Sequence, residues 1–115
     1  MSLEHLNRMA LGHALLANLF ASVTQNDSHP DLDLAAEHGL EAVDALELAR
    51  VAEKSDSPLE SVMHAHNSVS HAKKLSHILA RYYPDTRESR KAHFIVSGLN
   101  KVAIEHEQSH YGFMG

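Results

Sequence analysis

The feature that most constrains the fold is the placement of the chain's three prolines, at positions 30, 58 and 84. Proline suits the first turn of a helix and interrupts a helix interior, because its φ is fixed and it lacks an N–H. Between these positions, apolar residues recur at helical spacing, and no segment alternates like a strand hairpin. The pattern predicts one all-α domain over residues 1–115, a four-helix bundle. Since the connections are short, we expect it to be antiparallel, up-down-up-down.

The helix boundaries follow from capping signals. Ser2 and Ser57 are expected as N-caps, and Asp85 is preferred over Thr86 before the last helix. Residues 111–115 are expected to form a short docked or frayed tail. The four predicted helices run from Ser2 to about Thr24, from Pro30 to about Lys54, from Pro58 to near Tyr83, and from the Asp85–Thr86 cap to about His110.

The second predicted helix is apolar on more than one side. Its expected core face consists of Leu32, Ala36, Gly39, Val43 and Leu46. Further apolar residues lie off this face, namely Leu40, Leu48 and Val51. A helix of this kind is deeply buried or covers its second face with a partner. The pattern favours a homodimer or a contact with another protein.

Composition narrows the class of protein. The chain has no Cys, which excludes disulfides and thiolate metal sites. No secretory signal and no long apolar run are found, so the expected location is the cytoplasm and no membrane partner is expected. Acidic residues concentrate in residues 27–60 and basic residues in 73–101, but the net charge is -5. A nucleic-acid partner is therefore not favoured, since such domains are usually basic.

Histidine is the unusual residue of this chain, with eleven copies among 115 residues. Five residues near the end, His106-Glu107-Gln108-Ser109-His110, resemble the HExxH motif of zinc metalloproteases. That resemblance implies two histidine ligands for Zn²⁺ and Glu107 as the general base on a metal-bound water. It covers those five residues only, and the predicted fold lacks the edge strand that holds a peptide in that family.

A broader metal site is the alternative that the predicted bundle allows. The start of the first helix should lie beside the end of the last, so His13 or His5 could join His106 and His110 around one ion, Zn²⁺ being the expected choice. The competing interpretation is that these are buried structural histidines, each hydrogen-bonded to a polar partner. The two interpretations predict different surroundings for the same rings.

The sequence lacks a phosphate-binding loop, a nucleophile elbow and any other catalytic constellation. It therefore favours a non-catalytic protein that needs no cofactor and acts through protein contacts or self-association as a homodimer. The alternative is a histidine-based metal-binding bundle that uses the motif at residues 106–110, with Glu107 as the catalytic residue if it is hydrolytic.

Overall fold

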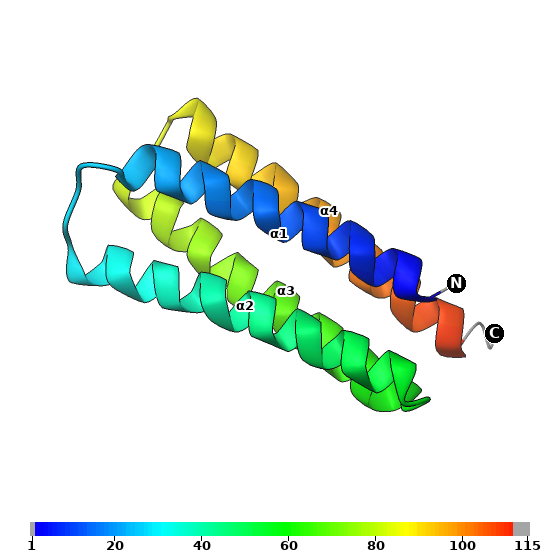
Figure 1. The fold of residues 1–115 in the computed structure, drawn as a ribbon. Helices are drawn as coiled ribbons and strands as arrows, with labels where there is room; N and C mark the ends of the chain where they lie inside the picture. The colour runs from blue at the N-terminus through cyan, green and yellow to red at the C-terminus, as the bar shows by residue number, and fades with distance from the viewer. Residues whose placement is uncertain (1, 112–115) are drawn as a thin grey trace.

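The structure, a computed structural model, describes residues 2–111 and confirms the four-helix bundle. Its helices are α1 (Ser2–Thr24), α2 (Pro30–Lys54), α3 (Pro58–Tyr82) and α4 (Arg87–Tyr111). In Figure 1 successive helices run towards opposite ends, so that the start of α1 lies beside the end of α4. The tail expected at residues 111–115 lies, beyond Tyr111, outside the described residues.

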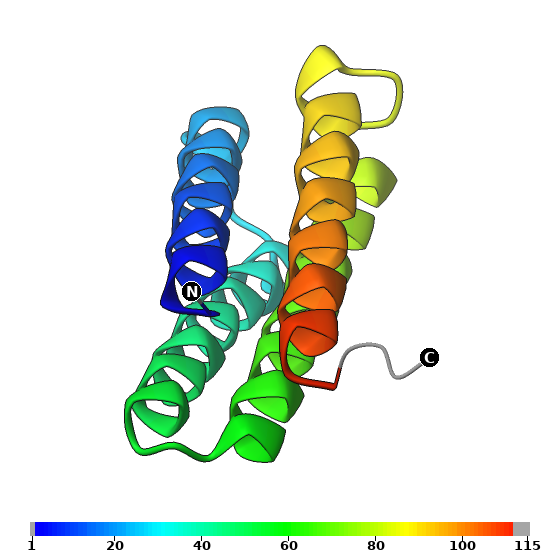
Figure 2. The same cartoon turned by 90° about the vertical axis from the view of Figure 1, so that its right-hand side faces the viewer.

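The most extensive helix contact in the bundle is between α2 and α3. α4 packs against both α1 and α3, while α2 and α4 are diagonal to each other (Figure 2). α1 and α4 come close at Gly12, where an added Cβ would lie 2.6 Å from a methyl carbon of Leu99. The missing side chain of Gly12 is therefore what lets these two helices meet.

Small side chains line the contact between α2 and α3. Ala35, Ala42 and Ala49 recur every seven residues on α2 and are buried, opposite an alternation of alanine and serine on α3. The predicted core face of α2 was therefore only partly correct: Leu32 and Leu46 are buried. The other members of that face, Ala36, Gly39 and Val43, are exposed or only partly covered. Alanine occupies the buried face of α2 because its small side chain allows the axes of α2 and α3 to approach.

Of the three predicted N-caps only Ser57 is at the expected position, and Ser2 is itself the first residue of α1. Ser57 precedes Pro58 at the start of α3, although its side chain makes no capping bond. Before α4 the preference for Asp85 was wrong, because the backbone N–H of Ser89 donates to Thr86 Oγ1 at 3.0 Å. Asp85 instead adopts a left-handed turn with φ 63°. Thr86 is therefore the N-cap of α4.

Several large apolar side chains remain on the surface. Leu40, Leu48 and Val51 of α2 are at least half exposed, as the two-sided pattern predicts. On the α1–α4 side, Phe94 is 79% exposed and Leu11 is 64% exposed. Within residues 2–111, no helix combines the length and apolar character that crossing a membrane requires.

Candidate metal centre

His106 is completely buried, and its hydrogen bonding fixes its tautomer. Ser61 Oγ donates its single hydrogen to the carbonyl oxygen of Ala49 at 3.1 Å. The contact of 2.8 Å between Ser61 Oγ and His106 Nε2 must then use a hydrogen from the imidazole. Nδ1 of His106 is left as an acceptor, buried and without a partner among the described residues.

A second triplet of histidine, serine and alanine carbonyl lies seven residues away along α3 and α2. Ser68 Oγ donates to the carbonyl oxygen of Ala42 at 2.6 Å, and His13 Nε2 donates to Ser68 Oγ at 2.7 Å. Burial lowers the pKa of His13 to about 4, so the ring is neutral near pH 7. His13 thus has the surroundings that the structural interpretation predicts for a buried histidine.

Three potential metal ligands converge where α2 and α4 end. His110 Nε2 lies 2.8 Å from Oε1 of Glu53, and His106 Nε2 lies 3.7 Å from the same oxygen. One ligand atom from each of the three side chains lies within 4.8 Å of the other two. The Glu53 side chain is only 15% exposed, so this carboxylate is largely shielded from water. We call this group the Glu53 centre.

The protonation states at the Glu53 centre are those of metal ligands. Burial alone would raise the pKa of Glu53, but the hydrogen bond from His110 is the largest of the influences that outweigh it and lower the pKa. Burial also lowers the pKa of His106 to about 4. The centre therefore presents a carboxylate and a neutral imidazole at neutral pH, the forms in which these side chains bind metals.

His5 lies beside the Glu53 centre. Its ring meets the ring of His106 edge-on, with the centroids 5.9 Å apart, and the His106 and His110 rings are 5.1 Å apart. Nδ1 of His5 is buried and, like Nδ1 of His106, has no hydrogen-bond partner among residues 2–111. Two such nitrogens at one place are unusual, since buried polar atoms are normally satisfied.

The predicted site residues thus fall into three places. The structure brings His106, His110 and His5 together, whereas His13 lies apart in its own triplet with Ser68. Glu107, the general base of the hydrolytic alternative, instead places Oε1 3.0 Å from Nε2 of His66, and both side chains are well exposed.

Sequence reasoning missed Glu53 as a partner of these histidines. Glu53 belongs to a helix with many carboxylates, none of which stands out by spacing. The available signal was topological. In an up-down bundle the second and fourth helices run in the same direction, so their C-terminal turns lie at the same end of the bundle. The last turns of α2 and α4 could have been searched for complementary ligands on that ground.

Neither a protein-family model, nor a curated protein, nor a solved structure matches this chain.

Proposed function

We propose that this protein binds a divalent transition metal at the Glu53 centre, through Glu53, His106 and His110. The observation that carries the proposal is the convergence of one carboxylate and two imidazoles within 4.8 Å. Two nitrogens and one carboxylate oxygen are a ligand set that suits Zn²⁺, with a fourth position open to water or to another molecule.

Binding through the two Nε2 atoms requires a rearrangement in each ring, because His110 Nε2 carries the hydrogen that Glu53 accepts and must also give it up. His106 Nε2 now carries the hydrogen that it donates to Ser61 Oγ. To bind a metal through Nε2, the ring must carry its hydrogen on Nδ1 instead, and the bond to Ser61 is lost. Nδ1 has no hydrogen-bond partner among the described residues, so the exchange loses the Ser61 hydrogen bond and leaves the moved hydrogen without an acceptor there.

The experiment is a Zn²⁺ titration of tag-free protein that has been stripped with a chelator. His110→Gln is the informative variant, because the glutamine amide can still donate to Glu53 while it is a poor metal ligand. We expect one equivalent of Zn²⁺ bound at this centre in the parent, and affinity lowered at least tenfold in His110→Gln and Glu53→Gln.

Glu107→Gln is the matched control, since Glu107 is on the same helix and its carboxylate bonds to His66. Its Zn²⁺ affinity should equal that of the parent. If His110→Gln and Glu53→Gln both bind Zn²⁺ as tightly as the parent, or if the parent binds none, the proposal is wrong.

Self-association is a second candidate function, supported by a surface between α1 and α4. A groove there is floored by Gly12 and Gly98 and flanked by Leu11, Leu15 and Phe94. Exposed phenylalanine beside exposed leucine is typical of surfaces that contact another protein. We infer that a second copy of this chain covers this groove in a homodimer.

Sedimentation over a range of protein concentrations tests the dimer. Phe94→Ser should abolish association, whereas Leu40→Ser, which alters the outer face of α2 in the same way, should leave it intact. The reverse result would move the interface to α2, as the sequence pattern suggested. A parent protein that stays monomeric at several hundred micromolar would exclude self-association as a function.

A further inference from the structure

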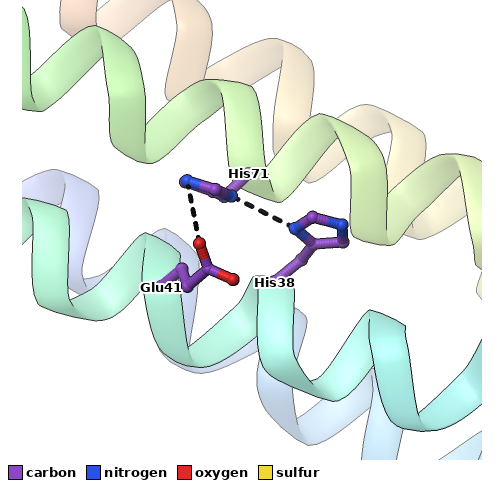
Figure 3. Close-up of side chains that lie close together, drawn as sticks. All are labelled: His38, Glu41 and His71. Carbon is purple, nitrogen blue, oxygen red and sulfur yellow. Dashed lines mark hydrogen bonds and ion pairs between the residues drawn. The ribbon is translucent and has the colours of Figure 1, made fainter.

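Two histidines face each other across the middle of the α2–α3 pair, away from the Glu53 centre. Nδ1 of His38, on α2, lies 3.1 Å from Nδ1 of His71, on α3. Glu41, one turn after His38, approaches the other side of the His71 ring, with Oε2 3.4 Å from Nε2. Figure 3 shows the order of the three groups: the His71 ring lies between the His38 ring and the carboxylate.

The carboxylate determines where the hydrogens lie. Oε2 of Glu41 is in ion-pair contact with Nε2 of His71, and its negative charge favours the tautomer in which His71 carries its hydrogen on Nε2. His71 Nδ1 therefore has a free lone pair, and the hydrogen in the contact between the rings belongs to Nδ1 of His38. If that hydrogen moves to Nε2 of His38, two nitrogen lone pairs face each other.

The spacing of those lone pairs matches the needs of a metal ion. Zinc binds imidazole nitrogen at about 2.0–2.1 Å, so two nitrogens on one tetrahedral ion are about 3.3 Å apart. The observed separation of 3.1 Å is close to that value. A histidine ligand also commonly donates its remaining N–H to a carboxylate, which fixes the ring and makes it a stronger base. Oε2 of Glu41 lies 3.4 Å from Nε2 of His71, where a small shift would let it accept that N–H.

The helices hold the two rings in place. Gly39 follows His38 directly, and an added Cβ there would lie 3.1 Å from a methyl carbon of Leu75 on α3. Ala72, the neighbour of His71, is fully buried. The backbones on which the two rings are mounted are thus fixed by close packing, so little ordering is needed when an ion binds.

We propose that His38 and His71 form a second, surface-accessible site for an imidazole-binding divalent ion such as Zn²⁺, with Glu41 positioning His71. A tetrahedral ion held by two imidazoles has two positions left, which water or a side chain of another molecule can fill. Neutral His38 only moves its hydrogen from Nδ1 to Nε2, so binding by the neutral rings releases no net proton.

The test is a Zn²⁺ titration of ¹⁵N-labelled, tag-free full-length chain, monitored through the imidazole nitrogens. We expect His38 to change from the Nδ1–H to the Nε2–H tautomer on binding, while His71 stays Nε2–H. His38→Gln and His71→Gln should each lower the affinity of this site at least tenfold. Glu41→Gln should weaken it about 10- to 100-fold without removing it.

His77→Gln is the matched control, because His77 is an exposed histidine on the same helix as His71. It should bind as the parent does. His110→Gln, which disables the Glu53 centre, should leave the His38 and His71 signals responding to Zn²⁺. The two metal proposals are therefore tested independently of each other.

Two results would overturn the second site. One is that His38→Gln and His71→Gln both keep the Zn²⁺ affinity and stoichiometry of the parent. The other is that the ¹⁵N signals of His38 and His71 in the parent do not move at saturating Zn²⁺. The second measurement needs no variant, so it decides the question even where a substitution unfolds the chain.

Discussion

The Nε2 atom of His110 lies 2.8 Å from Oε1 of Glu53, which joins the last turns of two helices that sit diagonally across the bundle. Both side chains are largely shielded, with 18% and 15% exposed. Glu53 is also 3.7 Å from Nε2 of His106, one turn earlier on α4. One carboxylate of α2 thus contacts two histidines of α4 at this end of the bundle.

Ser61→Ala tests whether the hydrogen bond of His106 competes with metal. The variant without metal should be destabilised by about 1–3 kcal/mol, because a buried imidazole N–H loses its acceptor. The affinity of the variant for Zn²⁺ should rise about tenfold, or about 1.4 kcal/mol, because metal binding no longer has to break the hydrogen bond between His106 and Ser61. Chemical denaturation with and without Zn²⁺ measures both. A folded Ser61→Ala protein with weakened Zn²⁺ binding would contradict the expectation.

Acid should destabilise the protein through His13. The unfolded state binds the proton with a pKa near 6.5, but burial lowers the pKa in the native state to about 4. The free energy of unfolding should therefore be flat above about pH 6.5 and fall as the pH drops towards 4, by about 3 kcal/mol at most from this residue. Urea denaturation at several pH values measures the slope.

The variant His13→Gln isolates that contribution. A glutamine amide can donate to Ser68 as the ring does, but it does not titrate. The pH slope between 6.5 and 4 should become shallower than that of the parent, with some slope left from His106, whose pKa burial also lowers. An unchanged slope would show that His13 does not carry the effect.

A pair of glycine substitutions tests the packing of α1 against α4. Gly12→Ala should destabilise by about 1–3 kcal/mol, because its Cβ would meet Leu99, a buried residue that cannot move aside freely. Gly98→Ala should stabilise by up to about 1 kcal/mol, since nothing lies within 4 Å and alanine favours helix. Thermal unfolding monitored by circular dichroism compares the two. Equal effects would contradict the close approach at Gly12.

The start of α4 gives a fourth prediction. Thr86→Ala should cost about 1 kcal/mol, because Ser89 loses the oxygen that accepts its N–H. Asp85→Gly should cost nothing measurable, since glycine adopts the φ of 63° easily. Denaturation midpoints of the two variants show which residue caps the helix. A larger loss of stability in Asp85→Gly than in Thr86→Ala would show that Asp85 is the N-cap.

The helices themselves were readable from the sequence because their signals are local. The prolines at 30 and 58 mark the starts of α2 and α3, and Pro84 falls in the turn before α4. Val62, Val69 and Leu79 recur at helical spacing along α3, and all three are buried. Spacing within one helix was sufficient for these features, since no knowledge of the neighbouring helix was needed.

The remaining features depend on contacts between helices. The buried face of α2 was misassigned because alanine is less hydrophobic than leucine or valine and contributes little to an apolar pattern. Its small volume nevertheless determines how closely helices pack. The interpretation of His13 and His106 as buried structural histidines could not name their partners, which are serines on α3. The facing pair of His38 and His71 was not anticipated, because it arises from the alignment of two helices rather than from any motif in one.

The two serine–histidine triplets also restrict how the helices can slide. Each bond joins a fixed level of one helix to a fixed level of another, His13 of α1 to Ser68 of α3 and His106 of α4 to the same helix at Ser61. A slip by one turn moves a side chain about 5.4 Å, which leaves a buried donor and a buried acceptor without hydrogen-bond partners. Leucine and alanine alone would tolerate several alignments. The histidines select one register, much as a buried asparagine does in a coiled coil.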